Sequence, residues 1–180
     1  MYGMIHKAAR EMALEEFGEE AWAAVLDTCA LDDRHFISGQ YYNDETTMAL
    51  IGELVTQTGM TAEDLLDAFG QHWVKFVSAS VYKSVIDMTG DNLVTFIENL
   101  NRMHDSIKAT MSKAVLPSFR VLENSAPVIR VLYKSPRTGF EYFVKGLLEG
   151  LMDKFGETGT VSFKAVGGGT EYLIRRQLPG

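Results

Sequence analysis

The sequence predicts an α+β fold, in which a helical N-terminal part packs with a C-terminal antiparallel sheet that carries an inserted helix. Up to about position 112, apolar residues recur three and four positions apart, which is the spacing of one face of a helix. After Pro117 the residues become β-branched, aromatic and alternating, as in strands. Helical spacing returns over Phe140–Phe155, between two pairs of expected strands, so this helix and the sheet are expected to share a core.

The composition describes a folded protein with a sizeable core. The chain has 180 residues, of which 46% are hydrophobic and 23% are charged, and it is expected to form one domain over residues 1–180. The net charge of −7 argues against a nucleic-acid partner, since binding phosphates needs a basic surface. The single cysteine, Cys29, excludes intramolecular disulfides, Cys-rich zinc sites and covalent haem attachment. No segment approaches the roughly 18 apolar residues of a membrane span, so we expect no membrane contact and a cytoplasmic location.

Four helical segments are expected in the first 90 residues. Gly18 interrupts the first, because glycine favours a break in a helix. Thr61, with Asp64 three residues later, has the pattern of a side chain that caps a helix N-terminus. Gly90 is expected to end the fourth segment. The expected helices are Gly3–Thr28, Thr46–Gly59, Thr61–Val77 and Tyr82–Met88.

The segment Asn92–Ser112 is predicted to be an amphipathic helix, with Asp91 or Asn92 as its N-cap. His104 lies where the apolar stripe requires a hydrophobic side chain, so its imidazole is expected to point into the interior. Such a histidine either is satisfied by a hydrogen bond in the core or binds a metal, and the spacing leaves both open. The apolar stripe consists of Leu93, Phe96, Ile97, Leu100, Ile107 and Met111.

Four strands are expected after Pro117, as two hairpins on either side of the helix Phe140–Phe155. A short connection of Asn, Ser, Ala and Pro joins the first pair. Gly167, Gly168 and Gly169 join the second pair, because glycine adopts the backbone angles that a tight turn requires. The expected strands are Ser118–Glu123, Val128–Lys134, Val161–Val166 and Tyr172–Gln177.

The end of the second expected strand carries three polar side chains that suit an anionic ligand. If the extended conformation continues, Tyr133, Ser135 and Arg137 share one face with the apolar residues before them. Arginine can donate a fork of hydrogen bonds to a carboxylate, and the two hydroxyls add donors. The alternative is that the strand leaves the core and Arg137 is simply exposed. An inward His104 together with this polar edge would suit an iron porphyrin, which needs an axial nitrogen and a site for its propionates.

Several segments together resemble the H-NOX family, the haem nitric oxide/oxygen-binding domains, and are similar to the haem-binding region of the β subunit of soluble guanylate cyclase. The most specific element is the Y-x-S-x-R motif of Tyr133, Ser135 and Arg137, combined with His104 on a preceding helix. The resemblance covers nearly the whole chain. The segments that carry it are MYGMIHKAA, FGQHWVKF, NLNRMHDSI, PSFR, YKSPR and FVKGLLEGL.

The resemblance implies that haem b is bound non-covalently between the helical part and the sheet. It implies that His104 is the proximal iron ligand and that Tyr133, Ser135 and Arg137 bind the haem propionates. Pro117 matches a family proline that packs against the porphyrin on the proximal side. Four further side chains match residues that line the pocket, Ile5 and Leu147 as apolar lining, and Trp73 and Phe143 on the distal side, where a diatomic gas binds.

In this family the distal side decides which gas is bound. Oxygen-binding members place a tyrosine there, which donates a hydrogen bond to the bound oxygen. Counting from Arg137, as in those members, reaches Tyr142, whereas counting back from Gly146 reaches Phe143. The glycine is the better anchor, because Phe143 and Leu147 lie four residues apart and therefore on one face of a helix. An apolar distal wall, typical of nitric-oxide-selective members, is expected.

The resemblance therefore implies a haem-based gas sensor that is not an enzyme, most simply a sensor of nitric oxide bound to ferrous haem, which also binds carbon monoxide. Nitric oxide would weaken the bond between iron and His104, and the helix that carries His104 would shift. The signal would pass to a separate protein, for which the family suggests a histidine kinase or a cyclic-di-GMP enzyme. An oxygen sensor that uses Tyr142 remains an alternative. A second alternative is a domain without haem that binds another apolar carboxylate or a partner. A third alternative is a haem peroxidase. The absence of a distal His/Arg pair near Trp73 argues against this enzyme.

Overall fold

The computed structural model of the chain describes residues 1–32, 34 and 36–177. The predicted α+β fold is confirmed, with helices in the N-terminal part and an antiparallel sheet that carries one inserted helix in the C-terminal part. The helices are α1 (Gly3–Cys29), α2 (Asp44–Thr58), α3 (Ala62–Ala79), α4 (Lys83–Thr89), α5 (Leu93–Thr110) and α6 (Glu141–Lys154). The strands are β1 (Ser118–Ser125), β2 (Val128–Lys134), β3 (Gly159–Val166) and β4 (Gly169–Arg176), paired in the order β1-β2-β4-β3.

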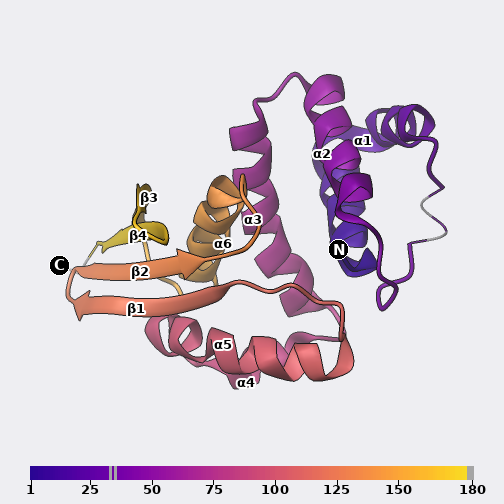
Figure 1. Cartoon of the computed structure of the whole chain (residues 1–180). Helices are drawn as coiled ribbons and strands as arrows, with labels where there is room; N and C mark the ends of the chain where they lie inside the picture. The colour runs from indigo at the N-terminus through magenta and orange to yellow at the C-terminus, as the bar shows by residue number, and fades with distance from the viewer. Residues whose placement is uncertain (33, 35, 178–180) are drawn as a thin grey trace.

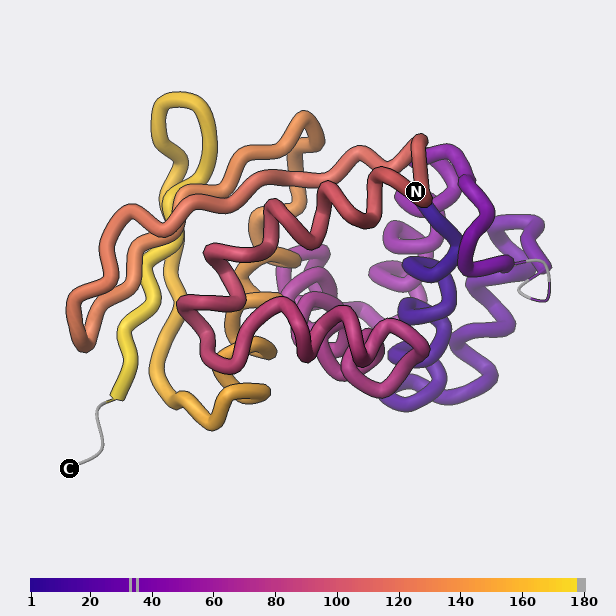
Figure 2. Tube along the Cα trace, turned by 90° about the horizontal axis from the view of Figure 1, so that it is seen from below, coloured from indigo at the N-terminus to yellow at the C-terminus, as the bar shows by residue number. Residues whose placement is uncertain are grey.

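The elements form two parts that meet at the long helix α3 (Figures 1 and 2). Helices α1 and α2 lie at one end of the molecule with the N-terminus, and the sheet lies at the other end (Figure 1). Between them α3 packs along α6, which makes the most extensive helix contact of the fold. Helices α5 and α6 in turn cover the inner face of the sheet.

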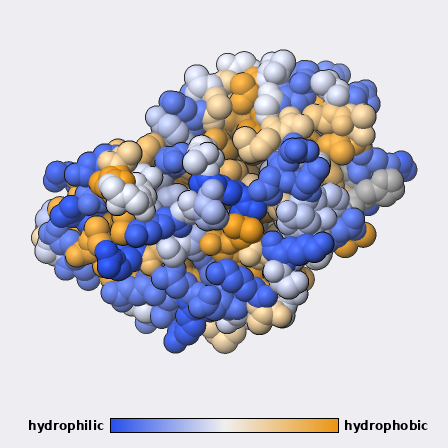
Figure 3. All heavy atoms as spheres, viewed as in Figure 1, coloured by the Kyte–Doolittle hydropathy of each residue, from blue (hydrophilic) through white to orange (hydrophobic). Residues whose placement is uncertain are grey.

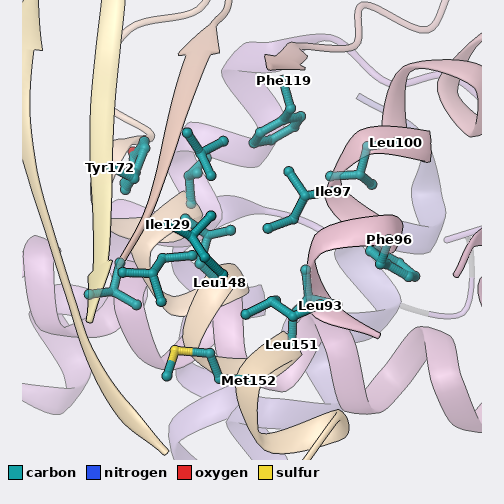
Figure 4. Close-up of a cluster of buried hydrophobic side chains, with 14 of the residues drawn as sticks. Leu93, Phe96, Ile97, Leu100, Phe119, Ile129, Leu148, Leu151, Met152 and Tyr172 are labelled. Atoms are coloured by element: carbon teal, nitrogen blue, oxygen red, sulfur yellow. The ribbon is translucent and has the colours of Figure 1, made fainter. Parts of the chain in front are cut away.

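Each part has its own hydrophobic cluster. In the larger cluster, side chains of α5 and α6 pack against the inner face of the sheet (Figure 4). Leu93 and Ile97 of α5 and Ile129 of β2 are fully buried there, as the apolar stripe and the strand alternation predict. The second cluster joins α1 and α2 to the first half of α3. Side chains that contact both clusters therefore lie where the two parts meet.

Side chains cap the N-termini of α2, α3 and α5. Asn43, Thr61 and Asn92 each accept a hydrogen bond from the backbone N–H three residues further on, at 3.0, 3.1 and 3.0 Å. The caps at Thr61 and Asn92 agree with the prediction, whereas the cap at Asn43 starts α2 two residues before Thr46. Gly18 interrupts α1 with a φ of 85°, as predicted.

The second hairpin differs from its prediction at the turn. Only Gly167 and Gly168 form the turn, and Gly169 pairs with Val166 as the first residue of β4. Two residues are sufficient because Gly168 adopts a positive φ of 84°. Gly169 also packs against β2, where a Cβ would lie 2.3 Å from the carbonyl oxygen of Tyr133. The glycine run joins the two strands as predicted, but its third residue belongs to the sheet.

The surface is polar with scattered apolar side chains. On the face shown in Figure 3, hydrophobic residues lie in separate patches between hydrophilic ones. Among the described residues, the most exposed large hydrophobic side chains are those of Val81, Met88 and Ile37. None of the described helices has both the length and the apolar composition that crossing a bilayer requires.

Two glycines allow α3 and α6 to approach closely where they cross. A Cβ at Gly70 would lie 2.1 Å from the carbonyl oxygen of Phe143, and a Cβ at Gly146 would lie 1.9 Å from the carbonyl oxygen of Asp67. Backbone atoms cannot move aside as the end of a flexible side chain can, so both positions require glycine at this separation. Lys145 reinforces the crossing, since its Nζ lies 2.7 Å from Oδ2 of Asp67.

The variant Gly146→Ala should destabilise the protein strongly, because the added methyl group forces α3 and α6 apart. We expect chemical denaturation to show a loss of about 3 kcal/mol or more in the free energy of unfolding, at or above the upper end for overpacked cores. Gly52→Ala on α2 is the matched control, since nothing lies within 4 Å of its added Cβ. Alanine there should stabilise the helix by up to about 1 kcal/mol. Equal stabilities for the two variants would contradict the tight crossing.

Candidate functional site

The imidazole of His104 on α5 contacts the segment that leads into β1. Its Nδ1 lies 2.9 Å from the carbonyl oxygen of Pro117. A carbonyl oxygen only accepts hydrogen bonds, so Nδ1 carries the proton and Nε2 of the neutral ring keeps a free lone pair. Burial lowers the pKa of His104, which favours this neutral form. The side chain is therefore prepared to bind a metal through Nε2.

Asn101, one turn before His104, fixes the same segment to α5. Its Nδ2 donates to the carbonyl oxygen of Phe119 at 2.7 Å, and its Oδ1 accepts from the N–H of Phe119 at 2.9 Å. The side chain thus pairs with the backbone of β1 much as a neighbouring strand would. Our sequence reasoning missed Asn101, although its position three residues before His104 places both on one side of the helix. Together these two residues hold the start of β1 against α5.

A cavity of about 330 Å³ opens where this segment meets the end of β2. Among the residues that line it are His104, Pro117 and Ser135, which come from a helix, a loop and the turn after a strand. A volume of this size lies within the range of small-molecule sites. The structure therefore brings together three of the residues that the sequence assigns to one site.

The polar motif after β2 does not continue the strand, so the prediction of a shared face is wrong beyond Tyr133. The strand ends at Lys134, and Oγ of Ser135 accepts a hydrogen bond from the N–H of Arg137 at 3.0 Å, which closes a turn around Pro136. Proline has no N–H and cannot extend a strand ladder, which explains the ending. The turn frees Arg137 to reach another part of the molecule.

Tyr133 itself lies on the inner face of the sheet, as predicted. Its ring packs against Phe119 and Tyr172, with centroids 5.4 and 6.1 Å apart. Burial raises the pKa of Tyr133, and a hydrogen bond with Ser135 partly offsets this rise. The two hydroxyl groups thus form one polar spot at the edge of the larger hydrophobic cluster.

Arg137 reaches across the molecule to the start of α2. Its Nε and Nη2 donate to the two carboxylate oxygens of Asp44 at 2.7 and 3.1 Å, and its Nη1 donates to the carbonyl oxygen of Val115. The amino group of Met1 also bonds to Asp44, at 2.9 Å. The hydrogen bond from Arg137 is the largest cause that lowers the pKa of Asp44 to about 2. Our sequence reasoning missed Asp44, because this ion pair joins residues 93 positions apart.

The remaining predicted residues lie against the two hydrophobic clusters. Trp73 and Phe143 contact both clusters, whereas Ile5 packs against the second and Leu147 against the larger one. All four are half-buried. Phe76, which the sequence analysis did not include, stacks on Trp73 with ring centroids 5.9 Å apart and also contacts both clusters. A partly open apolar wall where two cores meet suits a large, flat, apolar ligand.

The hydroxyl of Tyr142 is held away from that wall. Its ring packs edge-on against Phe163 of β3, with centroids 5.0 Å apart. A hydrogen bond with Glu63, in the first turn of α3, raises the pKa of Tyr142. Phe143, the next residue, instead packs against Phe69 of α3 with centroids 5.4 Å apart. Of the two candidates for the distal side, Phe143 is the one that contacts both clusters.

These residues fit a haem. His104 offers an axial nitrogen whose tautomer is fixed by Pro117. The polar spot of Tyr133 and Ser135 offers hydrogen-bond donors for a carboxylate, and the half-buried aromatic wall offers apolar contact. An iron porphyrin needs all three. The fold and the site together define a haem-binding domain.

The comparison with known proteins agrees. A family model described as haem-NO-binding matches residues 2–163, so the chain belongs to this family, the H-NOX domains. The family match and the fold show a haem-based gas sensor domain, and such a domain is not itself catalytic.

Curated relatives are soluble guanylate cyclases. Soluble guanylate cyclase gcy-34 of Caenorhabditis elegans is 26% identical over 83% of this chain. The β-2 subunit of soluble guanylate cyclase from Rattus norvegicus is 33% identical over 53% of this chain. The chain spans only 22% and 14% of the lengths of these two proteins.

Solved H-NOX structures share the fold. The protein from S. oneidensis in the Fe(II)NO ligation state superposes with a TM-score of 0.87 at 20% identity, covering 99% of this chain and 100% of that one. The unliganded Fe(II) protein from K. algicida gives a TM-score of 0.84 at 20% identity, with coverages of 99% and 98%. At such identities the likeness shows the fold of this chain.

The ion pair of Asp44 and Arg137 should make the stability of the protein depend on pH. The folded pKa of Asp44, about 2, lies below its ordinary value of 3.8, so the pair stabilises the fold above this ordinary value and is lost as the pH falls towards about 2. We expect the unfolding free energies of wild type and Asp44→Asn to differ by a constant amount above about pH 5 and to converge between about pH 4 and 2. Asp44 is 42% exposed, so solvent screening keeps the difference modest.

Urea unfolding at a series of pH values checks this expectation. Glu16→Gln on α1 is the control, since Glu16 is exposed and has no ion-pair partner within the described part of the chain. A difference between wild type and Asp44→Asn that stays the same from neutral to strongly acidic pH would show that the ion pair does not contribute.

Proposed function

We propose that the domain senses nitric oxide bound to ferrous haem b, and that His104 is the proximal iron ligand. The observation that carries this proposal is the hydrogen bond between His104 and Pro117, which leaves Nε2 as the free nitrogen. Within the described residues, only Nδ1 of His104 has a hydrogen-bond partner, so Nε2 is available to a ligand. The position of His104 beside the cavity also supports the role.

Tyr133, Ser135 and Arg137 are proposed to bind the haem propionates. The two hydroxyls lie together at the edge of the core. Arg137 uses three of the five N–H donors of a guanidinium for Asp44 and Val115, which leaves two donors for a propionate. A propionate there would extend an existing ion pair, since Arg137 already joins the start of α2 to the end of β2.

Ile5, Pro117, Trp73, Phe143 and Leu147 are proposed to line the haem pocket. Their half-buried state supports this role, because each keeps apolar surface that a porphyrin would cover. Pro117 in addition holds the ring of His104 through its carbonyl oxygen.

The proposed preference for nitric oxide follows from the distal wall. Bound haem supplies a ferrous iron that binds diatomic gases, carbon monoxide included. Bound oxygen is stabilised by a donated hydrogen bond, whereas nitric oxide needs little help from the protein. Phe143 has no donor, and the hydroxyl of Tyr142 is engaged with Glu63. This arrangement supports nitric oxide over the oxygen alternative.

The proposed signal is a weakened bond at Nε2 of His104. Since Nδ1 of His104 is bonded to Pro117, a movement of the ring acts both on α5 and on the segment that leads into β1. Such an element with two positions is what a ligand-driven switch requires. We propose that residues 1–180 act as one cytoplasmic domain and pass this signal to a separate protein, such as a histidine kinase or a cyclic-di-GMP enzyme.

The variant His104→Ala should lose haem, because alanine removes the nitrogen that is proposed to bind the iron beside the cavity. Wild-type protein should be coloured, with a Soret band that moves when nitric oxide is added, and the variant should regain haem when imidazole is supplied. Arg102→Ala, an exposed residue on the same helix, is the control and should behave as wild type. A colourless wild type that takes up no haemin would refute the function. Unchanged haem affinity in His104→Ala would remove His104 from its role.

The variant Phe143→Tyr should gain a stable oxygen complex in air, because it places a hydroxyl donor on the distal wall. A hydrogen bond of this kind is worth about 1.5–3 kcal/mol, so oxygen should dissociate about ten- to a hundred-fold more slowly. Tyr142→Phe is the matched control and should leave the gas preference unchanged. If wild type shows an oxygen complex that Tyr142→Phe abolishes, Tyr142 is the distal residue and the preference for nitric oxide is wrong.

A further inference from the structure

The outer face of the sheet has an apolar centre that the described helices leave uncovered. Helices α5 and α6 pack on the inner face, whose side chains belong to the larger hydrophobic cluster (Figure 4). Leu132 and Leu173 point outward, are half-buried, and belong to neither cluster. They are diagonal neighbours, because Leu132 pairs with Glu171 and Leu173 pairs with Arg130 across the strands β2 and β4.

Charged side chains surround this centre, and most of them are cations. Both carboxylates of the face are already paired with cations of the same face. Within the described part of the chain, Arg120, Lys134 and Arg175 are exposed and have no carboxylate partner. The face is therefore positive, although the whole chain carries a net charge of −7. Its charged residues are Arg120, Arg130, Lys134, Lys164 and Arg175, against Glu123 and Glu171.

We propose that this outer sheet face binds an acidic surface of the protein that receives the signal. Carboxylates of the partner would meet the unpaired cations, and an apolar patch of the partner would cover the two leucines. The proposal rests on the proposed sensing function, since it names where the output partner docks. Four strands about 4.8 Å apart and about eight residues long give a face of roughly 15 by 25 Å, which suits a transient signalling contact better than a permanent complex.

The composition of the face favours a protein over a nucleic acid or a membrane. Phe119, Tyr133, Phe163 and Tyr172 all lie on the inner face, so the outer face offers no aromatic ring on which a base could stack. The leucines are half-buried within the sheet and do not protrude as membrane anchors do.

The strands β1 and β2 connect this face to the haem site. Tyr133 faces the core, while its neighbours Leu132 and Lys134 face outward, so the strand presents the two surfaces in alternation. The strand β1 begins one residue after Pro117, which accepts the hydrogen bond from His104. A displacement at the site is thus passed to the outer face within a few residues of chain.

The test uses the haem-loaded full chain and three fluorescent probes. The probes are a peptide with Asp and Glu flanking two leucines, a single-stranded RNA, and phosphatidylglycerol vesicles. The sheet variant combines Arg120→Glu with Arg175→Glu. The control combines Lys7→Glu with Lys75→Glu, two exposed lysines of α1 and α3, and changes the net charge equally. We expect the peptide to bind the wild type, with affinity lowered about ten-fold or more in the sheet variant and about two-fold or less in the control.

Three outcomes would overturn the docking proposal. They are no peptide binding to wild type, an equal loss of affinity in both variants, and tighter binding of RNA or vesicles than of the peptide. The nitric-oxide-induced change in the absorption spectrum, measured in both variants, shows that each is folded and loaded with haem. A wild type that binds the peptide but takes up no haem would refute the sensing function and leave the docking face in place.

Discussion

The hydrogen bond from Nδ1 of His104 to the carbonyl oxygen of Pro117 is the interaction on which the site depends. Its net contribution to stability is only about 1 kcal/mol. Its larger effect is to leave Nε2 as the free ring nitrogen, while Nδ1 joins the ring to the segment that leads into β1. Asn101 adds two hydrogen bonds between α5 and the backbone of Phe119 in β1. One face of α5 therefore holds both the candidate ligand and the start of β1, which pairs with β2.

Most of the fold could be predicted from local patterns, because caps, stripes and alternation depend on near neighbours. The cap at Thr61 and the first half of the apolar stripe of α5, from Leu93 to Leu100, which is buried, are examples. The arrangement of the site was harder to predict from the sequence. Alternation placed Arg137 on the inner strand face, but Pro136 ends the strand and turns it away. Its partner Asp44 could not be found by any spacing rule, since only the packing of the two parts brings these residues together.

The two hydrophobic clusters explain why a ligand site can form between them. Each cluster has its own elements, and α3 and α6 connect them at a crossing so tight that it leaves no room for a Cβ at Gly70 or Gly146. The α3–α6 contact is therefore close and extensive, while Trp73 and Phe143 at the junction remain half-buried. A rigid crossing beside a partly open wall allows apolar surface to be covered by something other than protein.

The two tryptophans of the chain sit in different surroundings, which gives the domain built-in optical reporters. Trp22 is buried in the cluster of α1 and α2, whereas Trp73 is half-buried, stacked on Phe76 and in contact with both clusters. Indole emission depends on the solvent around the ring and is quenched by nearby absorbing groups. The fluorescence of the protein therefore combines emission from Trp22, in the interior of the helical part, with emission from Trp73, where the two parts meet.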